Sequence, residues 1–161
     1  MTFTKCVFCL ASGESVKITK EHLFSDWIND VLTPQVVGPN TSYERTSSTS
    51  SQPVTWPTPV VANVKARVAC EPCNSGWMCD LEGVVKPILT GPVLGHATQF
   101  TPQEQLDIAT WACMKAMVFE FAWSEPPAFT QPERGIVWSQ KRPPASAQIR
   151  IAAIESQGYP L

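Results

Sequence analysis

Two Cys-x-x-Cys pairs are the strongest chemical signal in this sequence. The first pair is Cys6 and Cys9, and the second is Cys70 and Cys73. Each pair can present two thiolates on one tight turn, and two such turns complete a tetrahedral zinc site with four sulfur ligands. Since sulfur then fills every position around the ion, the predicted zinc is structural. A redox Cys-x-x-Cys normally occurs once, at the start of a helix after a strand, so two pairs favour zinc.

The free-energy balance also favours zinc binding over four buried, unliganded thiols, which is the alternative. Bringing the pairs together closes the loop of residues 10–69, at a cost of about 3.6 kcal/mol. Structural zinc contributes about 10–16 kcal/mol in return. The N-terminal residues lack the apolar stretch of a secretion signal, so we do not expect disulfides. Cys79 and Cys113 lie among apolar residues, and we expect both to be small core side chains.

Glu21, His22 and Asn74 are of types that suit proton transfer and divalent-metal binding. A neutral imidazole on His22 can accept a proton from water. The carboxylate of Glu21 suits magnesium or manganese, and the amide oxygen of Asn74 can assist it. Each has a simpler alternative, because a histidine at a strand end is often structural and asparagine before a helix is a preferred N-cap. His96, in a connector, is expected to be an ordinary polar residue.

The elements that position these residues follow from the apolar spacing. Val16 and Ile18 alternate with polar residues, as on a half-buried strand. Helical spacing begins at Leu23, and Pro34 should end that helix. Residues 33–59 are rich in Pro, Ser, Thr and Gly and are expected to form a long exposed loop. Residues 60–69 should form a strand that leads into the second cysteine pair.

Two helices and two short strands are expected in the remainder. A helix with an apolar stripe should follow Cys73 and end near Gly91. Thr101 and Glu104 can form a capping box at the start of a helix over 101–122, whose apolar residues on two faces predict burial on two sides. After a Pro-rich break, residues 135–138 and 148–154 are expected to be strands. The sequence therefore predicts an α+β fold.

Charge and composition narrow the classes of function. The chain has 161 residues, of which 43% are hydrophobic and 16% charged, as in a globular protein of about one domain. No apolar run is long enough to cross a membrane. The formal net charge of −2 argues against coating of nucleic acid by bulk charge. The same net charge is compatible with a nuclease that gathers its basic residues at the site and gains further positive charge from a metal ion.

The order strand, Glu-His, strand, Cys-x-x-Cys-Asn, helix resembles the HNH endonuclease family, the ββα-metal or His-Me finger nucleases. The matching stretches are CVFC, ITKEHLFSDWI and VACEPCNSGWMCDLE, within residues 6–90. The resemblance implies a zinc-stapled ββα-metal finger with additional helices and a small C-terminal helix-plus-strand unit. The GWM…LE stretch is similar to one bacterial and phage subgroup, which implies a cytoplasmic location in a bacterial cell or a phage-infected host. Its Glu82 can hydrogen-bond a metal-site residue or remain an exposed helix carboxylate.

The resemblance also implies a role for each candidate by its place in the motif. His22 matches the general base, and Glu21 and Asn74 match the ligands of a catalytic Mg²⁺ or Mn²⁺ ion. Asn63 is the nearest candidate for the middle asparagine of the motif. The implied activity is metal-dependent hydrolysis of DNA phosphodiester bonds, with double-stranded DNA as the expected substrate.

Residues 1–100 are expected to form the nuclease module, with 33–59 as a loop insertion and 101–161 as an accessory region. The main alternative is a non-catalytic zinc-binding module that binds nucleic acid or a protein partner. A third interpretation is a zinc-dependent adaptor that docks through its Trp-rich C-terminal unit. Under either nucleic-acid interpretation four basic side chains would contact phosphates, and otherwise they are solvated surface charges: Lys65, Arg67, Lys141 and Arg142.

Overall fold

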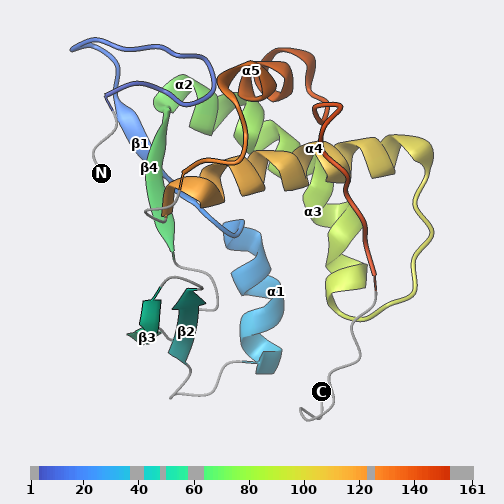
Figure 1. The fold of residues 1–161 in the computed structure, drawn as a ribbon. Coiled ribbons are helices and arrows are strands. Elements are labelled where there is room, and N and C mark those ends of the chain that lie inside the picture. The colour runs from blue at the N-terminus through green and yellow to red at the C-terminus, as the bar shows by residue number, and fades with distance from the viewer. Residues whose placement is uncertain (1–3, 37–41, 48–49, 58–63, 123–125, 153–161) are drawn as a thin grey trace.

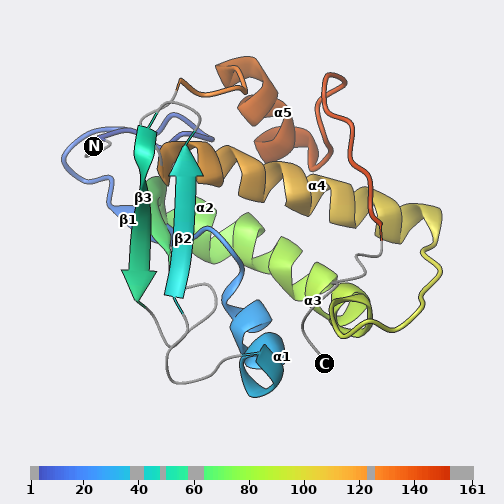
Figure 2. The same ribbon diagram turned by 60° about the horizontal axis from the view of Figure 1, so that its bottom comes forward.

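The computed structural model describes residues 4–36, 42–47, 50–57, 64–122 and 126–152. This part of the chain has an α+β fold, with two small antiparallel sheets and a set of packed helices (Figures 1 and 2). In chain order the elements are β1 Ile18–His22, α1 Asp26–Val36, β2 Ser42–Ser47, β3 Ser50–Pro57, β4 Lys65–Cys70, α2 Glu71–Cys73, the π-helical turn η1 Asn74–Met78, α3 Cys79–Val93, α4 Pro102–Phe119, the 3₁₀ turn η2 Glu120–Ala122 and α5 Gln131–Gln140.

Strands β1 and β4 form the sheet that carries Glu21 and His22. They pair antiparallel, with Ile18 opposite Cys70 and His22 opposite Lys65. The register shifts between Thr19 and Lys20, and such a bulge changes which side chains face the core. As a result both Ile18 and Glu21 are buried, although an unbroken strand would point them to opposite faces. The predicted second strand is confirmed for its described part, and its residues 60–63 lie outside the described residues.

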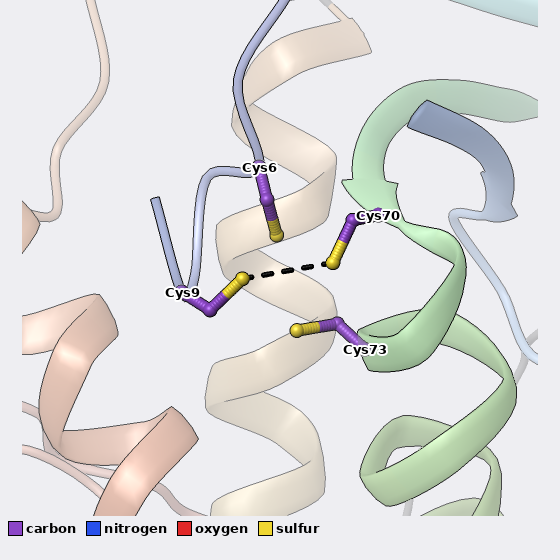
Figure 3. A group of neighbouring side chains, drawn as sticks. All are labelled: Cys6, Cys9, Cys70 and Cys73. Atoms are coloured by element: carbon purple, nitrogen blue, oxygen red, sulfur yellow. Dashed lines mark hydrogen bonds between the residues drawn. The ribbon is translucent and has the colours of Figure 1, made fainter. Parts of the chain in front are cut away.

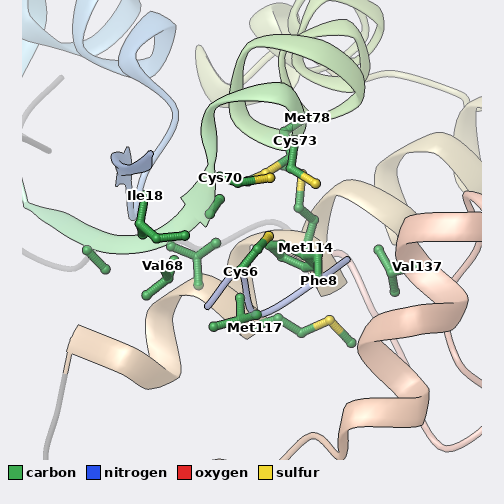
Figure 4. Close-up of a cluster of buried hydrophobic side chains, with 14 of the residues drawn as sticks. Cys6, Phe8, Ile18, Val68, Cys70, Cys73, Met78, Met114, Met117 and Val137 are labelled. Atoms are coloured by element: carbon green, nitrogen blue, oxygen red, sulfur yellow. The ribbon is translucent and has the colours of Figure 1, made fainter. Parts of the chain in front are cut away.

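The main core lies between the cysteine pairs, the β1–β4 sheet and helix α4 (Figure 4). Its fully buried members come from distant parts of the chain, including Phe8 near the N-terminus, Met78 in η1, Met114 and Met117 in α4, and Val137 in α5. Full burial of one such side chain contributes about 1.5–3 kcal/mol. The cysteine pairs are therefore embedded in the core of the protein.

Helix α4 is buried on two sides, as its sequence predicts. Thr101 and Glu104 form the predicted capping box, in which the Thr101 hydroxyl accepts from the Glu104 backbone N–H and the Glu104 carboxylate accepts from the Thr101 backbone. Met114 and Met117 face the main core, whereas Ile108 joins a second cluster with Trp27 of α1 and residues of α3. This arrangement places α4 beside both the cysteine pairs and the end of β1.

The predicted loop over residues 33–59 is wrong in two respects. Helix α1 continues through Pro34 to Val36, and a proline in the last helical turn removes only one backbone hydrogen bond. Strands β2 and β3 then pair antiparallel, with Tyr43 opposite Trp56. Aromatic and β-branched residues favour strands even among many serines, and the paired ladder supplies the remaining backbone hydrogen bonds.

The predicted strand over residues 135–138 is also wrong. Residues 131–140 form helix α5, which starts with a capping box between Thr130 and Glu133 and has a proline in its first turn. These start signals outweigh the short apolar stretch that suggested a strand. Residues 148–152 form no strand, and the last two residues of that prediction lie outside the described part of the chain.

Candidate functional site

The four cysteines of the two pairs converge on one point. The sulfur atoms of Cys6, Cys9, Cys70 and Cys73 all lie within 4.8 Å of one another, and Figure 3 shows them pointing toward a common centre. The Cys9 and Cys70 sulfurs are 3.6 Å apart, and all four thiols are free. Tetrahedral zinc with Zn–S bonds of about 2.3 Å needs sulfurs about 3.8 Å apart. The four cysteines are thus positioned to hold a metal ion such as zinc.

Local backbone geometry shapes the first cysteine turn. The Cys6 N–H donates to the Ala11 carbonyl at 2.9 Å, and the Leu10 N–H donates to the Cys6 carbonyl at 3.1 Å. Leu10 adopts a left-handed conformation with φ of 63°, which reverses the chain directly after Cys9. The Val7 N–H donates to the Val68 carbonyl of β4 at 3.0 Å. This bond links the turn that holds Cys6 and Cys9 to β4, the strand that ends at Cys70.

The second cysteine turn joins a strand to a helix. Cys70 is the last residue of β4, and α2 contains Cys73. The following π-helical turn includes Gly76 at φ −99° and ψ −115°, outside helical geometry, before α3 begins. A hydrogen bond from the Cys73 thiol lowers the pKa of the Cys6 thiol. A low thiol pKa favours the thiolate, which is the form that binds a metal ion.

Helix α5 and its C-terminal end cover the cysteine cluster from outside. The Gln131 side-chain amide donates to the Val7 carbonyl at 3.0 Å. The Lys141 ammonium lies 4.5 Å from the ring centre of Trp77, and that ring meets Phe8 edge-on at 5.2 Å. Four zinc-bound thiolates carry a net negative charge, so a nearby ammonium and an aromatic shield suit a loaded centre.

The other two cysteines take different positions. Cys113 is buried in the main core, as predicted. Cys79 is exposed on the first turn of α3, so the prediction that it is a core residue is wrong. The apolar residues around Cys79 in the sequence face inward from neighbouring positions of the helix, and its own position faces out. Cys79 therefore provides an accessible control thiol outside the cluster.

Glu21, at the end of β1, is buried in an ion-pair cluster. The Lys115 ammonium of α4 donates to Glu21 Oε1 at 2.5 Å and to the His22 carbonyl at 3.0 Å, and it also pairs with Glu82 Oε1 of α3. The Ser25 hydroxyl donates to Glu82 Oε1 at 2.5 Å. Burial raises the pKa of the Glu21 carboxyl, although Lys115 acts against this shift. Together Lys115, Glu21, Glu82 and Ser25 form the Lys115 cluster.

The His22 side chain remains partly accessible, with 24% of its surface exposed. Its Nε2 atom is 3.6 Å from Asp26 Oδ1, one helical turn along the chain. Burial, together with the positive charge of Lys65 across the sheet, lowers the pKa of His22. A lowered pKa keeps the imidazole neutral at pH 7, and a neutral imidazole can accept a proton.

Asn74 binds strand β1 and does not cap a helix. Its side-chain amide donates to Thr19 Oγ1 at 2.8 Å and to the Lys20 carbonyl at 3.1 Å. Its own backbone is helical, with φ −66° and ψ −51°, whereas an N-cap residue has extended angles. The structure thus brings Asn74 against the two residues that precede Glu21, and its amide orientation is fixed because Lys20 offers only an acceptor.

This contact changes the expected behaviour of two Asn74 variants. Asn74→Asp loses the N–H₂ group and places a carboxylate against the Lys20 carbonyl, so we expect it to lower the free energy of unfolding by about 1–3 kcal/mol. Asn74→Ala removes the same hydrogen bonds without adding charge and should destabilise less. Urea unfolding of both variants tests this order. An Asn74→Asp protein as stable as wild type would show that the bonds from Asn74 to β1 contribute little to stability.

Among the described residues, the cysteine cluster is the one group of three or more Cys, His, Asp or Glu side chains close enough to share a metal ion. The basic residues expected to contact phosphates fall in two places. Lys65 and Arg67 lie on the exposed face of β4, and the Arg67 guanidinium donates to the Ile18 carbonyl at 3.0 Å. Lys141 and Arg142 lie at the end of α5, where Lys141 contacts Trp77.

Lys115 is the residue of this site that sequence reasoning missed. A lysine within a helix whose apolar residues cover two faces was the available signal, because no exposed face is left for it. Lys115 also borders an apolar pocket of about 510 Å³ between α4 and the residues that follow His22; its walls include Leu23, Phe24, Ile28, Trp111 and Phe119. Lys115 therefore both lines the pocket and contacts the end of β1.

No family model, curated protein or solved structure matches this chain. In the described part of the chain no helix combines the length and hydropathy required to cross a bilayer.

Proposed function

We propose that this protein is a metal-dependent endonuclease that hydrolyses DNA phosphodiester bonds, with His22 as the general base. One observation carries the proposal. The antiparallel β1–β4 pair runs directly into the second cysteine turn and its helix, with Glu21 and His22 at the end of β1 and Asn74 bonded to the same strand. This order of parts, with α1, β2 and β3 inserted between the two strands, is similar to that of a zinc-stapled ββα-metal finger and supports the proposal.

The state of His22 supports the proposed chemistry. Its side chain is accessible, and its lowered pKa favours the neutral base at pH 7. Such a base can deprotonate a water molecule for attack on phosphorus. His22 also pairs across the sheet with Lys65, and Arg67 lies on the same exposed face of β4. These two cations would attract the phosphates of a bound strand to the side of the sheet that carries the base.

The donor set suits a hard divalent cation. Lys115 binds Oε1 of Glu21, and the hydrogen bonds of Asn74 use its nitrogen, so Glu21 Oε2 and Asn74 Oδ1 are the oxygens proposed to hold Mg²⁺ or Mn²⁺. When bound, the ion would supply positive charge to the phosphate oxygens and to the leaving 3′ oxygen. The cysteine-bound zinc would be structural, because four thiolates leave no position for substrate.

A second candidate function is a non-catalytic zinc module that binds nucleic acid or a protein. The ion pair between Glu21 and Lys115 and the bonds from Asn74 to β1 favour it, because both side chains already have structural partners. The two functions differ in one measurable property, which is the cutting of DNA.

Nicking of supercoiled plasmid by the zinc-loaded wild-type protein tests the proposal. We expect nicking with Mg²⁺ or Mn²⁺, a rapid stop on addition of EDTA, and recovery on addition of excess Mg²⁺ without refolding, because oxygen ligands release their ion more readily than thiolates release zinc. Zinc content before and after EDTA is the control. Failure of the wild-type protein to nick DNA with either ion would favour the binding module.

A further inference from the structure

The positive charge at the centre of the Lys115 cluster is the side-chain ammonium of Lys115. Lys115 and Glu21 are buried, and only 9% of the Lys115 side chain and 8% of the Glu21 side chain is exposed. The ammonium contacts oxygens from two other elements: Glu21 Oε1 and the His22 carbonyl in β1, and Glu82 Oε1 in α3. The Trp111 indole N–H donates to Ser25 Oγ at 3.1 Å, so a second residue of α4 supports the same cluster.

Such a cluster is a costly way to stabilise a fold. Removing an ammonium and two carboxylates from water carries a large desolvation penalty, and well-packed apolar residues often stabilise a protein equally well. Its distinctive property is geometric, because each charged hydrogen bond fixes the distance and direction between two elements. Here the elements fixed are α3, α4 and the end of β1, which carries His22.

The backbone around His22 is held from both sides. On one side the Leu23 N–H donates to the Val64 carbonyl at 2.9 Å, which closes the end of the β1–β4 pair. On the other side Lys115 binds the His22 carbonyl. Among the described residues the polar contact recorded for the imidazole is the 3.6 Å approach to Asp26, so the position of the backbone largely decides where the ring lies.

We propose that Lys115 is the positioning residue for His22: its ammonium binds Glu21, Glu82 and the His22 carbonyl, and so places the imidazole for proton transfer. This inference rests on the proposed function, in which His22 is the base. It adds that the catalytic end of β1 is set by helix α4, which lies outside the region that resembles a ββα-metal finger (Figure 1).

The test compares three variants in kinetics and in backbone hydrogen exchange. Lys115→Met removes the charge and keeps the aliphatic stem. The double variant Glu82→Gln/Lys115→Met removes both charges of the Lys115–Glu82 pair, so one carboxylate fewer is left unpaired while the proposed metal ligand Glu21 stays intact. Lys86→Met removes an exposed lysine of α3 and is the control. All rates are measured per folded, zinc-loaded molecule at 25 °C.

For Lys115→Met we expect kcat for plasmid nicking to fall about 100-fold, as for a small misplacement of a catalytic group, with KM changed less than about twofold. We expect exchange of the Leu23 amide to become about tenfold faster relative to the Val7 amide at the other end of the sheet. The double variant should regain melting temperature but not kcat, and Lys86→Met should match wild type in every measurement.

The possible failures are distinguishable. Wild-type nicking together with a near-normal kcat in Lys115→Met overturns the positioning role and leaves the proposed function intact. Recovery of kcat along with melting temperature in the double variant also overturns it, since Lys115 would then serve stability alone. If wild type does not nick, the proposed function fails by itself. The Leu23 exchange rate in Lys115→Met then still tests the contact between Lys115 and the His22 carbonyl. An unchanged rate would show that Lys115 does not hold this backbone, and a faster rate would support that it does.

Discussion

Cys70→Ser is expected to abolish zinc binding and to cause the largest loss of stability among the single variants considered. Cys70 ends β4 and is one of four sulfurs that converge within 4.8 Å. Structural zinc contributes about 10–16 kcal/mol, which is comparable to the whole stability of a domain, about 5–15 kcal/mol. Metal analysis should show one zinc ion per wild-type chain and close to none in the variant. Its melting temperature should fall by more than about 10 °C.

Cys79→Ser is the matched control for this experiment. Cys79 lies six residues beyond the last cysteine of the cluster, and its side chain is exposed. Its replacement should leave zinc content and melting temperature within error of wild type, because no packing or metal contact is lost. If Cys79→Ser loses zinc while Cys70→Ser keeps it, the ligand set inferred from the geometry is wrong.

His22→Ala is expected to lower the nicking rate by about 10²–10⁴-fold, which is the usual contribution of a general base. The side chain is partly exposed, and within the described part of the chain its recorded polar contact is a long one, 3.6 Å to Asp26, so the fold should lose little when it is removed. Initial rates on supercoiled plasmid at saturating Mg²⁺, with zinc content and melting temperature measured on the same samples, separate lost chemistry from lost structure.

His96→Ala provides the comparison for His22→Ala. His96 is the other histidine of the chain, and it is exposed in the connector between α3 and α4. Its removal should leave nicking unchanged. Equal nicking by wild type and His22→Ala would mean that another group deprotonates the water.

The features that the sequence predicts correctly are those with local signals. The spacing of Cys6, Cys9, Cys70 and Cys73 predicts a four-sulfur site because each pair needs only one tight turn to align its thiols. The helix over 101–122 has its capping box and a long apolar pattern, and both are properties of neighbouring residues. The same is true of the strand that leads into Cys70.

The features that it does not predict depend on contacts between distant residues. Lys115 meets Glu21 only after α4 packs against β1, and no periodicity in either segment announces that pairing. Asn74 has the residue type of a helix cap, yet its own backbone is already helical and its side-chain amide donates to the backbone of β1. In α5 the deciding signal is local, because the capping box of Thr130 and Glu133 starts a helix and outweighs the short apolar stretch that favours a strand.

The cover that α4 and α5 place over the cysteine cluster has a consequence for synthesis of the chain on the ribosome. Cys6 and Cys9 emerge first, but their buried neighbours Met114, Met117 and Val137 are made more than a hundred residues later. Contacts between such distant residues form late, because the intervening chain must first be ordered. Until then the thiols of Cys6 and Cys9 lack this cover and are open to oxidants and to competing metals, so we expect the metal supply during translation to affect how much correctly loaded protein is made.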